Sequence, residues 1–237
     1  MSSATLAQIV TDNPAAARIL ERHHLDYCCG GQRTLERACA DAGTDVDVVR
    51  HDLATEVTPG PMLDRPPLTP SELVDHLEVT HHRYLRGELP RLSALANKVL
   101  DVHGTRHPEL REVATLVDEL RADLEPHLAK EEQVLFPMIR ALATEAAVPA
   151  FHCGSVANPI SRMLAEHDHT GELLVELHTA TGGYRAPADA CASFRALYAG
   201  LAELEADTHL HVHKENNLLF PAVLHLEQER RTADRDH

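Results

Sequence analysis

Two stretches of the sequence carry nearly the same pattern of residues, and each holds a histidine and a glutamate four positions apart. One reads His127-Leu-Ala-Lys-Glu131 and the other His211-Val-His-Lys-Glu215, and both are soon followed by a Leu-Phe-Pro sequence. On a helix, side chains at positions i and i+4 lie on the same face, about 6 Å apart along the axis. Each pair therefore offers an imidazole nitrogen and a carboxylate oxygen to a metal ion.

The two patterns form an internal repeat. The histidines are 84 residues apart, as are the glutamates, and the segments that precede them match more loosely at an offset of 85. A duplicated helix pair brings equivalent residues close to its pseudo-two-fold axis. We therefore expect these six side chains to meet at a dinuclear metal site: His82, His127, Glu131, His167, His211 and Glu215. Mixed imidazole and carboxylate donors suit iron, manganese or zinc, and the residues alone do not choose among them.

Other titratable residues stand near these six. Asp123 and Asp207 each precede a histidine of the repeat by four positions. They are candidates to accept a hydrogen bond from that ring, or they belong to a solvated acidic face. The repeat favours His82 over its neighbour His81 as the ligand. Further histidines flank the site and are expected mostly to face solvent, and His103 is expected in an exposed loop; the flanking set is His81, His169, His209 and His213.

A second unusual motif, Cys28-Cys29-Gly30-Gly31, lies near the N-terminus. Adjacent cysteines form a disulfide only under strain, so we interpret them as a redox-active thiol or as a transient ligand that passes metal onward. The alternative is a buried thiol pair that fills space in a small core. If a helix begins near Thr34, its N-terminus would lower the thiol pKa. The other cysteines (Cys39, Cys153 and Cys191) have no such context and are interpreted as structural.

The elements that must position these residues are helices. Apolar residues recur at spacings of three and four over about 71–102, 107–143, 158–181 and 187–227, with Pro187 opening the last helix. Because no stretch alternates like a strand, we predict an all-α fold: an antiparallel four-helix bundle, hemerythrin-like, with a small N-terminal helical domain. The expected organisation is a helical domain at 1–57, a proline-rich linker at 58–70, the bundle at 71–228 and a polar tail at 229–237. Three prolines either kink these helices or end them: Pro90, Pro137 and Pro221.

Composition excludes several classes of function. The formal net charge is −15, which argues against nucleic acid or an anionic membrane as the main partner. Aromatic residues make up only 3% of the chain and tryptophan is absent, so base-stacking platforms are not expected. No apolar run reaches the length of a membrane-spanning helix, and the first residues do not resemble a signal peptide. We therefore expect a soluble, cytoplasmic protein.

The Asp26-Tyr27-Cys28-Cys29-Gly30-Gly31 motif, followed by a bundle with two His-x-x-Lys-Glu sequences, resembles the repair-of-iron-centres family. These are di-iron proteins with a hemerythrin-like domain. The resemblance implies two non-haem iron ions, bound terminally by the four histidines and bridged by the two glutamates and an oxo group. It also implies a redox or transfer role for Cys28 and Cys29. Oxygen-carrying hemerythrins differ, because this chain has Gly171 and Asn216 at positions where they use a histidine and an aspartate.

The function that the resemblance implies is repair of iron–sulfur clusters damaged by oxidative or nitrosative stress, by donation of iron. Damaged iron–sulfur proteins are then the clients, and nitric oxide or oxygen the small ligands. Two alternatives are a nitric oxide reductase that forms nitrous oxide and a sensor that binds oxygen or nitric oxide. Whether the chain is an enzyme and whether it forms a homodimer both stay open.

Overall fold

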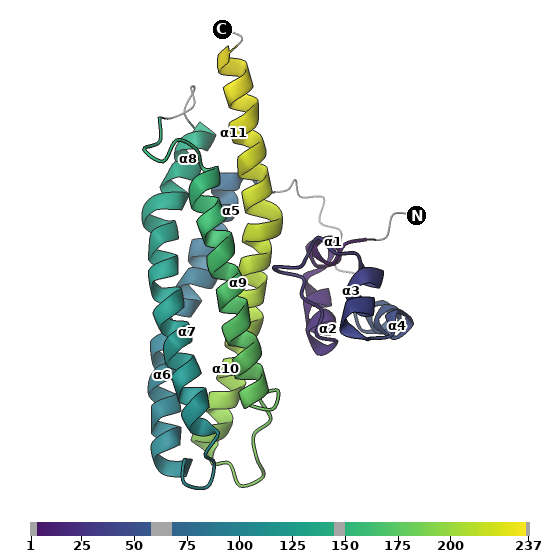
Figure 1. Ribbon diagram of the computed structural model, residues 1–237, viewed down its shortest axis with the longest axis vertical. Coiled ribbons are helices and arrows are strands. Elements are labelled where there is room, and N and C mark those ends of the chain that lie inside the picture. The colour runs from purple at the N-terminus through teal and green to yellow at the C-terminus, as the bar shows by residue number, and fades with distance from the viewer. Residues whose placement is uncertain (1–3, 58–67, 145–149, 236–237) are drawn as a thin grey trace.

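The computed structural model describes residues 4–57, 68–144 and 150–235 of the chain, and these ranges are built of helices joined by turns (Figure 1). Four long helical rods lie side by side, and a smaller group of short helices lies against one flank of them. The predicted all-α fold with an antiparallel four-helix bundle is confirmed. The predicted linker is described only at residues 68–70, because residues 58–67 lie outside the described part of the chain.

Three of the four rods change from α-helix to one π-helical turn and back. Their bounds, in chain order, are α5 (Pro70–Leu77), a π turn (Glu78–His82) and α6 (Arg83–His103) for rod one; α7 (Leu110–Lys130), a π turn (Glu131–Leu135) and α8 (Phe136–Thr144) for rod two; α9 (Ala157–Ala180) for rod three; and α10 (Ala192–Lys214), a π turn (Glu215–Leu219) and α11 (Phe220–Arg235) for rod four. Such turns are often found at functional sites.

The first rod starts close to the predicted position, and the fourth starts later than predicted. Thr69 caps α5 through a capping box with Glu72, and Pro70 takes the first helical position. The fourth rod begins at Ala192, so the prediction that Pro187 opens this helix was wrong. The N–H of Ala190 donates to the carbonyl of Pro187 at 3.0 Å. Pro187 therefore begins a turn ahead of the helix, and no helical residue follows it directly.

The predicted polar tail at 229–237 is helical over most of its length, because α11 continues to Arg235. Two polar side chains of this helix hold in place the loop that precedes α9. Glu227 accepts from the Ser155 hydroxyl at 2.6 Å and from the Val156 N–H at 3.3 Å, and Arg231 donates to the Gly154 carbonyl at 2.6 Å. The polar C-terminal residues thus extend the rod and fasten a loop, for which the sequence had indicated no role.

Pro137 and Pro221 do not end their helices. Each is the second residue after a π turn, and α8 and α11 continue beyond it. Proline lacks an N–H and clashes with the carbonyl four residues earlier. That earlier residue, Gln133 or Asn217, lies within the π turn, where the backbone bonding is already shifted. Pro90 also lies inside its helix, α6, so the helix-end interpretation was wrong for all three prolines.

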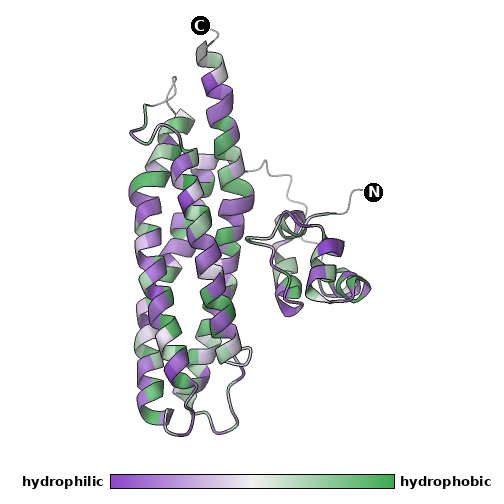
Figure 2. Cartoon of the chain, viewed as in Figure 1, coloured by the Kyte–Doolittle hydropathy of each residue, from purple (hydrophilic) through white to green (hydrophobic). Residues whose placement is uncertain are grey.

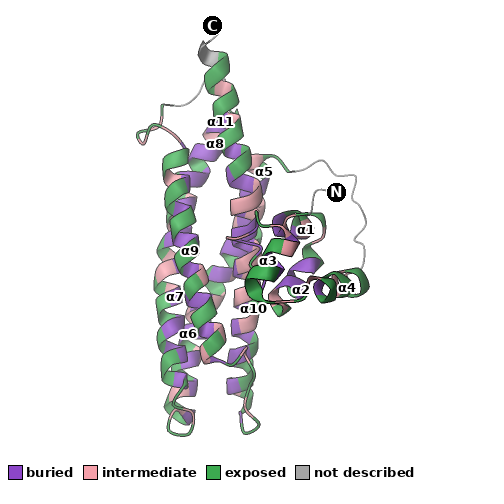
Figure 3. Cartoon of the chain, turned by 45° about the vertical axis from the view of Figure 1, so that its right-hand side comes forward, coloured by how far each residue is buried: buried purple, intermediate pink, exposed green. Residues whose placement is uncertain are grey.

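The small N-terminal unit packs on the fourth rod, in front of α10 in Figure 3. Its helices are α1 (Leu6–Asp12), a 3-10 turn (Pro14–Ala16), α2 (Ala17–Arg22), α3 (Leu35–Ala42) and α4 (Val46–Glu56). Thr5 and Thr34 cap α1 and α3, and their backbones form an isolated bridge. The apolar core of this unit includes Val212 of α10, so the bundle completes a core that the short helices do not close by themselves.

The core of the bundle is divided into two apolar clusters by a polar layer. Each rod presents hydrophobic and hydrophilic residues in alternating bands (Figure 2). One cluster, which includes Leu89 and Leu201, fills the end with the α6–α7 corner, and the other, which includes Leu77 and Ile139, fills the end with α5 and α8. The buried histidines and glutamates of the sequence repeat lie between these clusters. None of the helices in the described ranges is long and apolar enough to cross a membrane.

Candidate metal centre

The six side chains predicted as metal ligands meet in the polar layer between the two clusters. Every one of them is buried, with at most 2% of its surface exposed: His82, His127, Glu131, His167, His211 and Glu215. Each rod contributes at least one residue, and three of the six belong to π turns. The structure therefore brings together all six residues that the internal repeat singled out.

Their potential ligand atoms form two groups of four, within which all atoms lie within 4.8 Å of one another. One group contains His82 and His211, and the other contains His127 and His167. Glu131 and Glu215 belong to both groups. Two imidazoles for each group and two shared carboxylates form the arrangement expected for a pair of cations with bridging oxygens.

The Nε2 atoms of the four histidines face these carboxylates. His127 Nε2 lies 3.4 Å and His82 Nε2 3.5 Å from Glu131 Oε2. Glu215 is approached in the same way, by His167 at 3.1 Å and by His211 at 3.3 Å. The distance from His127 Nε2 to His167 Nε2 is 3.2 Å. All four rings thus direct the same nitrogen into one small volume.

The donor atoms in this volume fit a cation. Both carboxylate oxygens of Glu131 and of Glu215 are buried without a hydrogen-bond partner, as are the Nε2 atoms of His82 and His211. Burying a carboxylate without a partner is costly. A positive ion at each group would satisfy these atoms at once, and the imidazole and carboxylate set suits iron, manganese or zinc.

Electrostatics at the centre agree with this fit. Burial alone would raise the pKa of the Glu215 carboxyl, but the His211 and His167 imidazoles lower it well below its ordinary value. Burial alone would lower the pKa of His127, but the charge of Glu131 raises it to about 9. Both shifts arise because the carboxylates attract positive charge into a dry site. A bound cation would take the place of the proton that the imidazoles otherwise hold.

Three of the four rings are oriented by a second contact at Nδ1. His82 Nδ1 lies 2.9 Å from Glu132 Oε1, and His127 Nδ1 lies 2.9 Å from Glu166 Oε2. His167 Nδ1 lies 2.7 Å from the carboxamide oxygen of Asn216. Because these oxygens accept a hydrogen bond, each Nδ1 carries the proton and each Nε2 keeps its lone pair for a metal.

Asp123 and Asp207 do not have the ring-holding role suggested by their spacing. Asp207 Oδ1 lies 2.9 Å from His81 Nδ1, and Asp123 accepts from the Thr170 hydroxyl at 2.7 Å. The Nδ1 atoms of the oriented rings point across to a neighbouring rod and not along their own helix, so residues one turn earlier are out of reach.

The residues that do orient the rings were missed, although the sequence holds a signal for them. Glu132 and Asn216 each follow a shared glutamate and occupy matched positions of the repeat, and Glu166 precedes His167. A residue adjacent to an inward-facing ligand on a helix lies about 100° away around the axis. It is therefore directed toward the neighbouring rod, where it can reach a ring on that rod.

The flanking histidines are less exposed than predicted. His169 faces solvent and His209 is partly covered, but His81 and His213 are only 4% and 2% exposed. His213 is covered by the N-terminal unit, where its ring contacts Tyr27. His81 Nε2 accepts from Lys214 Nζ at 2.7 Å, and its ring stacks on that of His211.

His103 and Cys191 meet at the far end of the bundle. His103 is buried and not in an exposed loop as predicted. Its Nε2 atom lies 3.2 Å from the thiol of Cys191. Helix α10 begins directly after this cysteine, so the contact joins the end of the first rod to the start of the fourth.

The cysteine motif forms a turn around the carboxylate of Asp26. The N–H groups of Cys28 and Cys29 donate to Asp26 Oδ1 at 3.0 Å, and that of Gly30 donates to Oδ2 at 2.7 Å. A hydrogen bond to Cys29 and burial raise the pKa of Cys28 well above its ordinary value. Thr34 does cap a helix, but the expectation of a lowered thiol pKa was wrong for Cys28, because the hydrogen bond with Cys29, burial and the Asp26 carboxylate raise the pKa of this thiol.

Asp26, Cys28 and Cys29 also bring one potential ligand atom each within 4.8 Å of one another. They line a cavity of about 780 Å³ between the N-terminal unit and the bundle. Its other acidic residues include Asp168, Glu172 and Glu176 of α9. Neither thiol is in a disulfide.

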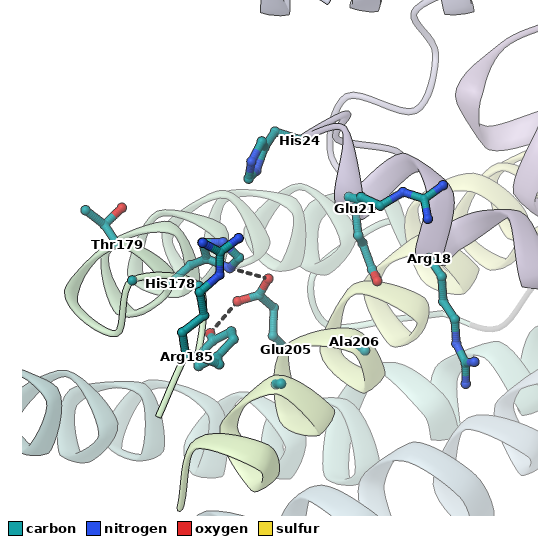
Figure 4. Close-up of a pocket in the computed structure, with 13 residues that line it drawn as sticks. Arg18, Glu21, His24, His178, Thr179, Arg185, Glu205 and Ala206 are labelled. Carbon is teal, nitrogen blue, oxygen red and sulfur yellow. Dashed lines mark hydrogen bonds and ion pairs between the residues drawn. The ribbon is translucent and has the colours of Figure 1, made fainter. Parts of the chain in front are cut away.

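A neighbouring cavity of about 640 Å³ lies at the α9–α10 corner (Figure 4). His178 Nδ1 and the Tyr184 hydroxyl both contact the carboxylate of Glu205 on its wall. His24 and Tyr184, which both line this cavity, have φ angles of 55° and 58°, a left-handed conformation that is uncommon for such residues. None of the six potential ligands lines either cavity.

Comparison with known proteins identifies similarity over both parts of the chain. Residues 73–223 match the hemerythrin HHE cation binding domain, and residues 2–56 match a domain of unknown function, DUF542. An iron–sulfur cluster repair protein, YtfE, of Enterobacter sp. (strain 638) is 37% identical over 219 residues, which are 92% of this chain and 96% of that protein. The YtfE proteins of Escherichia coli O81 (strain ED1a) and Escherichia coli O1:K1 / APEC are 35% identical, with the same coverage.

Proposed function

The chain belongs to the family of iron–sulfur cluster repair proteins with a hemerythrin HHE cation binding domain, and from this membership we propose that it repairs damaged clusters by delivering iron. In this proposal the centre between the rods holds two iron ions, and Cys28 and Cys29 receive iron on its way to a client. The clients are iron–sulfur proteins damaged by oxidative or nitrosative stress. The small helical domain at 1–57 presents the thiols, and the bundle at 71–228 stores the ions.

The observation that carries the proposal is the sharing of both carboxylates between the two ligand groups. His82, His127, His167 and His211 would each bind one ion through Nε2, and Glu131 and Glu215 would each bridge the pair. When bound, iron at such a centre supplies redox chemistry and open coordination positions for nitric oxide or oxygen. Glu132, Glu166 and Asn216 orient three of the four imidazole rings through their Nδ1 atoms.

The composition of the centre favours delivery over permanent storage. Each ion would have two imidazoles and share its carboxylates with its neighbour, so the two positive charges would repel each other across the shared oxygens, which would favour release of one of them. The donor set contains imidazole and carboxylate but no thiolate. The softer thiolates of Cys28 and Cys29 stand apart in the N-terminal loop, where they offer a second type of ligand to a departing ion.

Two other functions use the same centre and are separated from delivery by one experiment. A nitric oxide reductase would turn over many times while retaining its iron, and a sensor would bind oxygen or nitric oxide reversibly. The purified chain is loaded anaerobically with two ferrous ions, and reductant, nitric oxide and an acceptor whose damaged cluster has lost iron but kept its sulfide are added. Nitrous oxide and the iron content of both proteins are then followed together.

Delivery predicts that iron leaves this chain as the acceptor regains its cluster, and that Cys28→Ser together with Cys29→Ser slows this transfer. Catalytic accumulation of nitrous oxide with the iron retained would replace the proposal with the reductase. Reversible binding without turnover or iron loss would replace it with the sensor. The matched control is Cys153→Ser, because Cys153 packs against the apolar cluster at the α5–α8 end and lies outside the thiol motif.

A further inference from the structure

The loop with Cys28 and Cys29 is fastened to the fourth rod next to the metal centre. His213 Nδ1 lies 3.3 Å from the carbonyl oxygen of Tyr27. The Asn217 carboxamide donates to the carbonyl of Cys28 at 3.0 Å and accepts from Gln32 Nε2 at 3.0 Å. These anchors flank Glu215, so the loop is held by the same stretch of helix that supplies a shared carboxylate.

Asn216 contacts both the loop and the centre. Its oxygen lies 2.7 Å from Nδ1 of His167, whose Nε2 faces the metal site. Its nitrogen donates to the carbonyl oxygen of Cys28 at 3.5 Å. One carboxamide thus lies between a potential metal ligand and the backbone of the thiol motif, with its acceptor toward one and its donor toward the other.

The repeat shows what is special about an amide at this position. Glu132, the matched residue, orients His82 in the same way. The other oxygen of Glu132 accepts from Arg86 Nη2 at 2.7 Å, within the bundle. A carboxylate has no N–H to donate, and at position 216 it would face the Cys28 carbonyl with a lone pair. The amide therefore allows a contact with the loop that the equivalent carboxylate would not make.

We propose that Asn216 is a positioning residue that couples metal binding at His167 and Glu215 to docking of the Cys28–Cys29 loop. The inference rests on the proposed function in one respect: it requires a metal ion at these two ligands. The His167 ring cannot rotate when its Nε2 is bound, so its Nδ1 continues to donate to the Asn216 oxygen. The Asn216 nitrogen then continues to donate to the Cys28 carbonyl. Such coupling is reciprocal, so the docked loop also stabilises the bound metal.

The test measures backbone hydrogen exchange of residues 27–33 in the full chain, metal-free and after anaerobic loading with ferrous iron. Iron content is measured in the same samples by elemental analysis. Coupling predicts that exchange over 27–33 is about 5-fold slower or more in the loaded protein, the lower end of typical coupling strengths. Exchange over the outer helix of the N-terminal unit, residues 46–56, is the internal reference and stays unchanged.

Asn216→Asp separates the two contacts of this residue. Aspartate keeps an oxygen that accepts from His167 but has no donor for the Cys28 carbonyl. In this variant, loading with saturating iron is expected to change exchange over 27–33 by less than about 2-fold, because the coupling is lost. The matched control is Asn158→Asp, which makes the same chemical change at a carboxamide that donates to the Cys153 carbonyl at 2.7 Å, outside the metal centre, and it retains the full wild-type response. Circular dichroism verifies that both variants are folded.

Every outcome of this experiment either supports or overturns the coupling through Asn216. Equal exchange in metal-free and loaded wild-type protein overturns the coupling and leaves iron delivery as proposed. Retention of the full response by Asn216→Asp, or its loss in Asn158→Asp, also overturns the role assigned to Asn216. If the wild-type chain binds no metal at all, both this inference and the proposed function fail.

Discussion

Glu131 and Glu215, on the second and fourth rods, have carboxylate oxygens within 4.8 Å of each other, and each glutamate belongs to both groups of potential metal ligands. No other residue of the two groups is shared in this way. Because both carboxylates are buried without hydrogen-bond partners, their mutual repulsion in a dry site is relieved only by positive charge. The pair should therefore control binding of both ions, whereas each histidine should control one.

Replacement of either shared glutamate is expected to affect both ions together. Glu131→Ala or Glu215→Ala should reduce the bound metal from two ions to fewer than one per chain, and Glu131→Gln should do the same without creating a cavity. The measurement is elemental analysis after anaerobic loading and gel filtration. His169→Ala, an exposed position on α9, is the control and should retain both ions. Two retained ions in the alanine variants would contradict the bridging assignment.

The two ions are expected to bind with different affinities. Both rings of the His127–His167 group are held at Nδ1, but in the other group His211 Nδ1 has no partner. Loss of such an outer contact typically costs about 10- to 100-fold in metal affinity. Stepwise titration of the metal-free protein should therefore show one tight and one weaker ion. His211→Ala should retain the tight ion, and two sites of equal affinity would contradict this prediction.

The raised pKa of Cys28 predicts that this thiol reacts slowly with alkylating reagents at pH 7. A pKa above the ordinary value leaves less thiolate at pH 7, so the rate of Cys28 alkylation by iodoacetamide should increase with pH without levelling below pH 9, near the ordinary thiol pKa. Asp26→Asn retains an oxygen for the turn but removes a charge that opposes the thiolate, and it should increase the rate at pH 7 several-fold. Mass spectrometry resolves each cysteine. A plateau near pH 7 would instead indicate an activated thiol.

The contacts of Glu227 predict a pH-dependent contribution to stability. Burial alone would raise the pKa of this carboxyl, but hydrogen bonds from Ser155 and Arg231 lower it below 4.5. Its contribution is therefore present above pH 4.5 and is lost as the pH falls through the lowered pKa. Glu227→Gln should reduce the free energy of unfolding by about 1–3 kcal/mol at pH 7. Urea denaturation should show a smaller difference at pH 3, and an equal difference at both pH values would contradict the prediction.

Gly31 has no room for a side chain. A Cβ atom there would lie 2.4 Å from the carbonyl oxygen of Tyr27 and 2.9 Å from Asn217 Oδ1. Gly31→Ala should therefore displace the thiol loop from the fourth rod and reduce stability by about 1–3 kcal/mol, while the bundle still binds metal. Gly87→Ala is the control, because that helical position is open, and it should stabilise by about 0.5–1 kcal/mol. Thermal unfolding and hydrogen exchange over 27–33 distinguish the two.

The positions of the inward-facing residues could be predicted from the sequence because the repeat and the helical period constrain them independently. His82 and Glu131 each recur at a matched offset, and both lie on faces that apolar spacing turns inward. The π turns could not be predicted in this way. Each of them starts or ends at one of the six ligand residues, and it changes the helical phase that a regular period assumes.

The outer contacts depend on distances between rods, which the sequence does not contain. The spacing of Asp207 to His211 indicates a contact along one helix, but Asp207 instead lies 2.9 Å from Nδ1 of His81 on the first rod. His213 seemed free to face water for a related reason: the sequence does not show that the N-terminal unit covers this part of α10. The raised pKa of Cys28 likewise follows from burial between two parts of the chain.

The polar layer interrupts the bundle core, and this has a consequence for how the molecule can open. The apolar residues on either side form two separate clusters, with the ligands at their boundary. Each apolar cluster can therefore stay folded when the polar layer between the two loses its balance of charge. In the proposed delivery, an ion would leave through a brief local separation of the rods, and neither apolar cluster would have to unfold to release it.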